Sequence, residues 1–466
     1  MKPLLGIGGV RVRMLALVVT EHVLIVLAVG LAALLRFGFE QAGPELAYHV
    51  AWRASLIAVV LQICLHYSDL YEFRTLKDRR GVMVGLIQAL GAASIVLALI
   101  YYWLPNLVIG RGIFVIASTM IVALVAGWRI AFEWLSLRLG PAERLLIVGT
   151  SGAAVALARE LFDRRQELGV ELVGFVDPDP ARVGTPLINP GVVGAIADIP
   201  TLTRERRVDR VVVSLADARG KLPMEELLRM RLNDGVRFDH LASVYEEYTG
   251  RIAVENLRPS WLIFSAGFRK SRRASALKRG MDIILSAAGL VCAAPLLLIA
   301  AFAIRVTSSG PVLYHQERVG REGRRFTIHK LRSMSVDAEV ATGPVWSRAG
   351  DPRVTPVGRF LRRTRFDELP QLWNVLKGDM SFVGPRPERP AFVDDLTREV
   401  PYYGQRHVVR PGVTGWAQVR HNYGGDPDGA LQKLQYDLFY IKHQSVAFDL
   451  FILLETVKTV MVRSGS

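Results

Sequence analysis

The stretch Glu143–Ala154 reads ERLLIVGTSGAA, and the character of the chain changes there. Long apolar runs precede it, and short apolar runs separated by turn residues follow it. Arg144–Gly149 has the apolar character of a buried parallel strand, and the Ala-rich residues after it predict a helix to about Gln166. Two further predicted strands are Glu171–Asp177 and Asp209–Leu215. Strands that alternate with helices predict a parallel α/β domain, which we place at residues 141–262.

The loop after the first predicted strand has part of a dinucleotide-binding pattern. Gly149 and Gly152 flank Ser151, which stands where that pattern has the glycine that admits the pyrophosphate. Asp177 ends the second strand, where an acid would bind ribose. No Tyr-x-x-x-Lys pair of the dehydrogenase kind follows. We therefore expect a Rossmann-like domain for packing or regulation, with nucleotide binding by Gly149, Gly152 and Asp177 as the weaker interpretation.

The first third of the chain contains four long apolar stretches. Each approaches or exceeds the about 17–25 residues that cross the hydrocarbon core of a membrane. They are Met14–Leu35, Ala51–Tyr67, Val82–Leu104 and Ile113–Leu135. Lys and Arg gather at the N-terminus, after the second stretch and after the fourth, so both ends of this region should face the cytoplasm. We expect a four-helix transmembrane domain over residues 1–140, in which Glu21 and His22 pair within the protein.

The whole chain is apolar and basic. Of its 466 residues, 51% are hydrophobic, and 58 Lys and Arg against 43 Asp and Glu give a net charge of +15. Such a charge predicts an anionic partner, which could be lipid head groups, nucleic acid or phosphorylated small molecules. The apolar stretches favour membrane lipid and small molecules, and we expect no nucleic-acid partner. Cys64 and Cys292 lie in apolar runs and predict neither a disulfide framework nor a metal site.

A fifth apolar stretch, Ile283–Ile304, has a proline near its middle. Cations precede it from Arg269 and follow it to Arg332, so both of its ends prefer the cytoplasmic side. Pro295 lacks a backbone donor and breaks or kinks a helix. We therefore predict a re-entrant membrane helix at residues 281–305, with an ordinary kinked span as the alternative.

The segment that carries the chemistry reads GRFLRRTRFDELPQLWNVLKGDMSFVGPRPE from Gly358 to Glu388. Asp367 and Glu368 precede Pro370, which suits the first turn of a helix, and carboxylates there are often only caps. Here arginines precede the pair, and a rigid Gly-Pro-Arg-Pro turn follows it with Arg386. Carboxylates among fixed cations indicate a site for a phosphorylated, metal-bound substrate.

From about Ser275 onward the chain resembles the bacterial sugar transferases that act on polyprenyl phosphate, the monotopic phosphoglycosyl transferases. The strings that carry the resemblance include Lys278-Arg279-x-x-Asp282, the Pro-broken apolar helix, Phe326-x-Ile328-x-Lys330-Leu331-Arg332-Ser333-Met334, the Gly358–Glu388 segment, Arg410-Pro411-Gly412-Val413-Thr414-Gly415-Trp416 and Tyr436-Asp437-x-x-Tyr440. The N-terminal arrangement resembles the long form, which starts exopolysaccharide, capsule or O-antigen repeat units. One departure is Arg365-Phe366, where many relatives have a smaller polar residue and Leu. The resemblance implies a mainly helical catalytic domain at residues 263–466.

The resemblance also implies a reaction and roles for residues. Asp367 would attack the phosphate next to the sugar of a UDP-sugar, releasing UMP, and undecaprenyl phosphate would then take the phosphosugar. Glu368 would bind Mg²⁺ together with Asp367. The cations expected to offset phosphoryl charge are Lys330, Arg362, Arg386, Arg332, Arg318 and Arg410. Asp437 carries over as an essential acid, or it anchors one of these cations.

Two other functions stay open at this point. A membrane-tethered, NAD-dependent nucleotide-sugar epimerase or dehydratase would need the dinucleotide loop to be intact. A non-catalytic scaffold of polysaccharide assembly would make Asp367 replaceable. We expect the bacterial inner membrane as the location, with both soluble domains on the cytoplasmic side, and a homodimer by base rate. The sequence does not specify the sugar.

Overall fold

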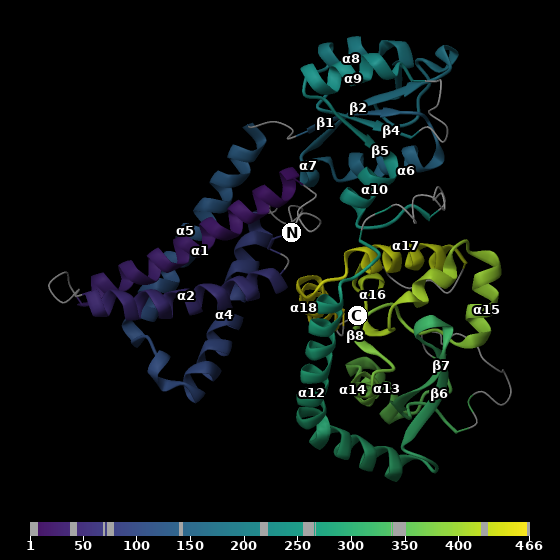
Figure 1. The fold of residues 1–466 in the computed structure, drawn as a ribbon. Helices are drawn as coiled ribbons and strands as arrows, with labels where there is room; N and C mark the ends of the chain where they lie inside the picture. Colours follow the sequence, from purple (N-terminus) through teal and green to yellow (C-terminus); the bar gives the residue numbers. More distant parts are fainter. Residues whose placement is uncertain are drawn as a thin grey trace. The chain divides into compact units, whose positions relative to one another are not determined.

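The computed structural model describes residues 8–37, 44–68, 70–71, 79–138, 143–214, 222–254, 265, 267–336, 338, 351–420 and 427–463. Their contacts divide the chain into two units, Met1–Leu241 and Ala242–Ser466. Each unit is described by itself (Figure 1). The domain boundaries expected after residues 140 and 262 fall outside the described residues.

The four apolar stretches of the first third form long helices. These are α1 (Gly8–Phe37), α2 (Pro44–Tyr67), α4 (Arg79–Trp103) and α5 (Arg111–Arg138), with the 3₁₀ helix η2 (Pro105–Leu107) between the last two. Small and branched side chains such as Ile25, Ala58, Ala89 and Val125 join all four in one buried cluster. Among the described residues, five helices are long and apolar enough to cross a membrane, these four and α12 (Arg272–Thr307). The chain is therefore a membrane protein.

A buried ion pair joins two of these four helices. Arg129 of α5 donates to both carboxylate oxygens of Glu21 in α1, at 2.6 and 3.1 Å. The guanidinium also donates to the Leu70 carbonyl, and the Tyr71 hydroxyl donates to Glu21. His22 bonds to Gln62 of α2 at 3.0 Å. Glu21 and His22 thus pair within the protein, as expected.

The rest of the first unit is a parallel sheet covered on both faces. Its strands are β1 (Glu143–Val148), β2 (Val170–Asp177), β3 (Val192–Ala195), β4 (Arg210–Val213) and β5 (Arg237–His240), in the order β3-β2-β1-β4-β5. The helices are α6 (Gly152–Asp163), α7 (Arg165–Leu168), α8 (Ile199–Glu205) and α9 (Met224–Asn233), with short 3₁₀ helices η3 (Pro180–Arg182) and η4 (Ile196–Asp198). In Figure 1, α8 and α9 cover one face and α6 and α7 the other. The Rossmann-like expectation is met.

The sequence prediction differs from this sheet in three details. It missed β3 and β5, because four-residue strands are too short for their pattern to stand out. The first helix ends at Asp163, and the last turn before β2 is the separate helix α7. Val213 ends the third expected strand, and Leu215 lies outside the described residues.

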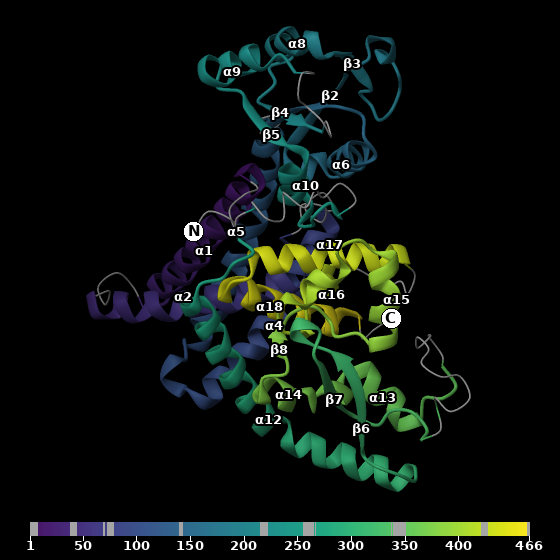
Figure 2. The same ribbon diagram turned by 45° about the vertical axis from the view of Figure 1, so that its right-hand side comes forward.

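In the second unit, α12 is one continuous helix of 36 residues with Pro295 inside it. It begins nine residues before the expected residue 281, because the Ser271 side chain caps it by accepting from the Ala274 amide. Of the two effects expected of Pro295, a break in the helix is therefore wrong, since the helix continues through the proline, and the re-entrant course of the helix stays a prediction. The ribbon of α12 nevertheless changes direction sharply within its length in Figures 1 and 2, as a proline that removes a backbone donor dictates.

The remainder of this unit is mainly helical, with two small sheets. The elements are β6 (Leu313–Val319), η6 (Arg321–Gly323), β7 (Arg325–Leu331), α13 (Pro356–Thr364), η7 (Phe366–Glu368), α14 (Gln371–Lys377), β8 (Ser381–Val383), α15 (Pro390–Glu399), η8 (Tyr403–Val408), β9 (Gly412–Thr414), α16 (Trp416–Arg420), α17 (Pro427–His443) and α18 (Val446–Arg463). Strands β6 and β7 are antiparallel, and β8 and β9 are parallel. The unit also includes α10 (Leu241–Thr249) after Leu241.

The start of α12 is fixed to this unit by polar side chains. Lys278 donates to Asp449 of α18 at 2.6 Å and to the Val383 carbonyl of β8 at 3.1 Å. Arg279 donates to two carbonyls at the end of α14. The buried Asp282 carboxylate accepts from the Ser381 hydroxyl and the Phe382 amide of β8. The Lys278-Arg279-x-x-Asp282 string therefore anchors the start of the apolar helix to the rest of the second unit.

Glu21→Gln should destabilise the membrane helices, because it leaves a buried guanidinium without its carboxylate. Breaking one partner of a buried pair typically costs about 3–5 kcal/mol, whereas replacing both with apolar groups is often nearly neutral. We expect a lower melting temperature in detergent for Glu21→Gln and recovery for Glu21→Leu combined with Arg129→Met. Equal melting temperatures for the wild type and Glu21→Gln would contradict the role of this pair.

Candidate active site

The hairpin of β6 and β7 places Lys330 on one wall of the site. Lys330 lies opposite Tyr314 in the antiparallel register. The buried Asn374 side chain of α14 fixes this strand, since its amide donates to the Thr327 carbonyl and its oxygen accepts from the His329 amide. Two bonds from one side chain hold β7 beside the segment that carries Asp367 and Glu368.

The acidic pair lies in a short 3₁₀ helix rather than in the first turn of α14. Helix α13 begins at the Thr355 cap and ends at Arg365, which adopts the left-handed conformation with φ 60°. This conformation starts the new turn of η7. Pro370 has no N–H to donate to the Phe366 carbonyl, and that carbonyl accepts from Leu369 instead. The expected first helical turn was therefore wrong in detail, although the pair does directly precede α14.

Asp367 is a buried carboxylate with a free oxygen. Its exposed fraction is 7%, and its Oδ1 has no hydrogen-bond partner within the described part of the chain. Burial raises the pKa of Asp367 to about 6, and the charge of Glu368 adds to the rise, against the opposing effect of Lys330 and Arg362. A desolvated carboxylate oxygen without a partner is available to react or to bind a cation.

Glu368 is the charged counterpart of Asp367. Its Oε1 accepts from Lys330 Nζ at 2.9 Å and from Arg386 at 3.0 Å, and Arg365 lies 3.9 Å away. Burial alone would raise the pKa of Glu368, but Lys330 and Arg386 hold it well below its usual range. Burial lowers the pKa of Lys330, and Glu368 partly reverses this effect. Glu368 is therefore firmly ionised, whereas the pKa of Asp367 is raised to about 6.

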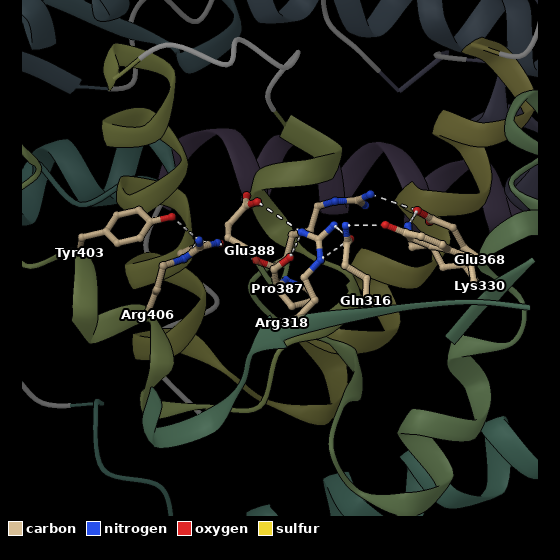
Figure 3. A network of polar contacts seen from close by, with 11 residues as sticks. Gln316, Arg318, Lys330, Glu368, Pro387, Glu388, Tyr403 and Arg406 are labelled. Carbon is tan, nitrogen blue, oxygen red and sulfur yellow. Dashed lines mark hydrogen bonds and ion pairs between the residues drawn. The ribbon is translucent and has the colours of Figure 1, made fainter. Parts of the chain in front are cut away.

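A buried cation supports the backbone of Arg386. Arg406 of η8 donates to the Arg386 carbonyl at 3.0 Å and pairs with Asp437 of α17 at 2.8 Å. Its third contact is the Tyr403 hydroxyl at 2.6 Å, which Figure 3 shows beside the Arg406 guanidinium. Asp437 and Arg406 are each only 3% exposed in their side chains. Asp437 therefore does anchor a cation, but this cation is Arg406 and none of the six predicted from the sequence. Its role as an essential acid stays a prediction.

Arg318 belongs to the same network (Figure 3). It donates to the Gln316 side chain and to the Pro387 carbonyl, and it lies 3.8 Å from Glu388. Burial lowers the pKa of Arg318 to about 10. Arg318 thus fixes Pro387 and Glu388, the two residues that follow Arg386.

The remaining predicted cations lie at different places. Arg362 donates to the Ser333 hydroxyl at 2.8 Å, and its charge lowers the pKa of Asp367. Arg332 donates to Ser308 at the end of α12, and Arg410 donates to the Gly378 carbonyl at the end of α14. These hydrogen bonds of Arg332 and Arg410 join parts of the fold and do not reach the acidic pair. Their role in binding phosphate stays a prediction.

Sequence reasoning did not single out Asn374 or Arg406. Asn374 lies inside the Gly358–Glu388 string, but nothing in the pattern separates a buried structural amide from a surface one. Arg406 lies between the recognised strings, and only the spatial approach of η8 to α17 reveals it. A buried ion pair between distant segments leaves no signal in spacing.

The weaker candidates lie in the first unit. Gly149 has φ 95°, and Gly152 begins α6. The Ser151 hydroxyl caps that helix by accepting from the Ala154 amide and also bonds to Ser214. Asp177 accepts from the Thr150 hydroxyl and lies 3.4 Å from Arg182. These side chains are satisfied by one another, which does not favour a dinucleotide at this loop.

The described residues contain no group of three or more His, Cys, Asp or Glu that could hold a metal ion. A cation held by protein ligands alone therefore does not fit the described part of the chain. The free Oδ1 of Asp367 beside Glu368 does fit Mg²⁺, which binds one or two carboxylates and completes its shell with water and substrate phosphate.

Asp437→Asn should reduce stability, because it leaves buried Arg406 without its carboxylate. The expected cost is about 3–5 kcal/mol, as for other buried pairs, and it is measured as a lower melting temperature of the catalytic unit. The matched control is Asp395→Asn, since Asp395 pairs with Arg398 only at the surface and is 65% exposed. Loss of activity with an unchanged melting temperature would instead make Asp437 a direct participant.

Two regions of the chain match known protein families. Residues 273–463 match the family model described as bacterial sugar transferase, and residues 66–234 match a CoA-binding domain. The chain is 40% identical over 260 residues to a UDP-N-acetylgalactosamine-undecaprenyl-phosphate N-acetylgalactosaminephosphotransferase of Aeromonas hydrophila. That match covers 56% of this chain and 60% of the relative.

Two further relatives are matched over more of their length. Both are named UDP-glucose:undecaprenyl-phosphate glucose-1-phosphate transferase. The relative from Escherichia coli is 35% identical over 346 residues, which is 71% of this chain and 70% of the relative. The relative from Klebsiella pneumoniae is 29% identical over 434 residues, which is 90% of this chain and 85% of the relative. Similarity of this extent shows that the chain belongs to the bacterial sugar transferase family.

Proposed function

We propose that this protein transfers a hexose-1-phosphate from a UDP-sugar to undecaprenyl phosphate through a covalent aspartyl phosphosugar. In the first step, an Asp367 oxygen attacks the phosphorus that carries the sugar, and the bond from that phosphorus to UMP breaks, so UMP leaves with the electron pair. In the second step, a phosphate oxygen of undecaprenyl phosphate attacks the same phosphorus. The Asp367 carboxylate is released, and the sugar diphosphate lipid is formed.

The observation that carries this proposal is the free, buried oxygen of Asp367. A carboxylate that is already bonded to arginine or to backbone amides is a poor nucleophile, because those bonds must break first. The Oδ1 of Asp367 has no such bond within the described residues. Glu368 takes the ion pairs instead, through Lys330 and Arg386.

The cations beside the pair have a role in the same reaction. A phosphoryl group in transfer carries negative charge on its outer oxygens, and fixed cations stabilise that charge without reorganising. Lys330 and Arg386 already lie within 3.0 Å of Glu368, and Arg386 keeps about a third of its side chain exposed to a substrate. The charge of Arg362 lowers the pKa of Asp367 and so favours its ionised form.

We also propose Mg²⁺ as the cofactor, bound by Asp367 and Glu368 together with the substrate's phosphates. When bound, Mg²⁺ would neutralise part of the diphosphate charge. The residues of this chain would orient the donor, exclude water from the buried carboxylate and hold the departing phosphate with Arg386.

The bent helix α12 would bring the site close to the lipid acceptor. Ala300 and Ile304 in the second half of α12 pack in one cluster with Leu331 of β7 and Phe366, the residue before Asp367. A membrane helix thus contacts the segment that carries the nucleophile. We propose that α12 enters and leaves the cytoplasmic face of the bacterial inner membrane, which would hold the site where lipid phosphate and soluble nucleotide sugar meet.

The relatives described above are named for N-acetylgalactosamine and for glucose, and we propose one of these two sugars for the donor. We propose that the product begins a bacterial polysaccharide repeat unit, whether exopolysaccharide, capsule or O-antigen. One relative, from Rhizobium leguminosarum, is named for exopolysaccharide production. A homodimer stays a prediction.

Asp367→Asn should abolish transfer of label from UDP-sugar to lipid and also abolish UMP release, because an amide does not form the phosphosugar ester. The assay uses purified full-length protein, Mg²⁺, undecaprenyl phosphate, and radiolabelled UDP-N-acetylgalactosamine or UDP-glucose. Asp395→Asn, an exposed Asp, serves as the control and should keep full activity.

The outcomes separate the three functions. Transfer by Asp367→Asn at the wild-type rate would exclude this nucleophile. Absence of transfer by the wild type with both sugars would favour a scaffold. A strict requirement for added NAD would favour the epimerase or dehydratase.

The membrane topology is tested with single cysteines at Ser271, directly before α12, and at Ser335, which follows α12 and the β6–β7 hairpin, in a chain whose Cys64 and Cys292 have been replaced. A re-entrant helix keeps both positions in the cytoplasm, so an impermeant maleimide outside intact cells should label neither. Both should react after the membrane is opened. Labelling of position 335 alone from outside would show that α12 crosses.

Pro295→Leu should move part of the population toward the crossing state. A straight apolar helix of about 20 residues is long enough to span the membrane, and the proline no longer bends it. The readout is the fraction of position 335 that the external reagent labels. Ile299→Leu, an exposed apolar change in the same helix, should leave the labelling unchanged.

A further inference from the structure

The segment of residues 242–254 lies before the part of the chain that matches the sugar transferase family, which begins at residue 273. It is nevertheless packed into the catalytic unit. Ile252 is 1% exposed and Val254 is 2% exposed, and both belong to the same buried cluster as Leu434 and Tyr440 of α17. The 242–254 segment is thus part of the core around α17.

Polar contacts join this segment to the end of α17. Glu246 of α10 is buried, and its carboxylate accepts from Lys442 Nζ at 2.7 Å. The other oxygen of Glu246 contacts the ring nitrogen Nε2 of His443. The side chains of Lys442 and His443 are only 13% exposed. One buried carboxylate therefore holds the last turn of the helix.

Contacts from the segment's second half reach further along α17 and onto α16. The Ile252 amide donates to the Gln435 carbonyl at 3.1 Å, and the Trp416 indole donates to the Gly250 carbonyl at 2.9 Å. The Arg251 guanidinium lies over the rings of Tyr245 and Tyr436, at 5.8 and 5.5 Å from their centres. The segment therefore fixes α17 at two levels, near residue 435 and at its last turn.

Helix α17 connects these contacts to the proposed active site. Asp437 lies between the two levels, and Lys442 follows it by about 8 Å of helical rise. Asp437 holds Arg406, and Arg406 holds the backbone carbonyl of Arg386. Arg386 in turn contacts Glu368. A shift of α17 would move this chain of contacts as a unit.

We propose that Glu246 is a positioning residue, and that the 242–254 segment sets the place of Arg386 through α17, Asp437 and Arg406. The catalytic unit of this chain then begins near Ala242 rather than at the first residue of the family match. This inference rests on the proposed function for its kinetic consequence, but its structural consequence does not depend on any activity.

The test compares full-length wild type with Glu246→Gln. Backbone amides of residues 403–408 and 435–443 should exchange with deuterium about tenfold faster in the variant, because the helix and η8 lose a common anchor. The KM for the UDP-sugar that the wild type accepts should rise about tenfold, since a misplaced phosphate-binding group weakens binding of the donor. Loss of folded protein alone would lower kcat and leave KM unchanged.

Matched variants make the result specific. Glu225→Gln changes an exposed Glu of α9 and should alter neither exchange nor KM. Lys442→Met removes the pair with Glu246 but leaves the contact of Glu246 with His443, so it should raise exchange and KM in the same direction as Glu246→Gln and by no more. The double variant should be no worse than Glu246→Gln alone, because the two changes remove one shared pair. Additive effects would contradict a shared action.

Each outcome decides the proposal. Unchanged exchange in residues 403–408 of Glu246→Gln overturns it, whatever the kinetics. Faster exchange there with an unchanged KM overturns the link to Arg386. If the wild type transfers neither sugar, the proposed function fails by itself, and the exchange comparison still decides whether Glu246 positions η8.

Discussion

The ion pairs of Glu368 are the interaction on which the site depends. Lys330 and Arg386 both contact Oε1 of its carboxylate. Three charged groups are stable together in a mostly buried place only because they are paired. Because Glu368 takes both cations, its neighbour Asp367 keeps an oxygen without a partner. The charge of Glu368 and the burial of Asp367 both raise the pKa of Asp367, so the two acids are distinct in chemistry although adjacent in sequence.

The three groups of this cluster come from segments that only the fold brings together. Lys330 lies on β7, Glu368 on η7, and Arg386 follows β8. Helix α12 joins two of these segments, since its second half packs against Leu331 and Phe366. The apolar helix α12 is therefore long and apolar enough to cross a membrane and also packs beneath the segment that carries Asp367. Pro295 lies inside this helix and removes one backbone donor, which favours a change of direction within it.

Much of this arrangement could be predicted from the sequence, because the signals are local. The apolar helices, the strands β1, β2 and β4, and the acidic pair before Pro370 all leave a pattern within about 20 residues of sequence. The 3₁₀ turn of η7 could not be predicted, because it depends on the left-handed backbone conformation of Arg365 and on Pro370, which has no backbone N–H to donate. The role of Asp437 could not be settled either, since its partner Arg406 lies 31 residues away.

A residue in one of the sequence strings that resemble the sugar transferases can have a structural role rather than a chemical one. Lys278 belongs to such a string, yet it binds the Val383 carbonyl, as does the Tyr440 hydroxyl. Val383 is followed by Gly384, where an added Cβ would collide with the Arg410 carbonyl oxygen, so only glycine fits at this close approach of two backbone segments. Arg386 comes two residues later. The residues that tie α12, α17 and β8 together therefore help to fix the place of the Arg386 guanidinium beside Glu368, although none of their hydrogen bonds reaches the acidic pair directly.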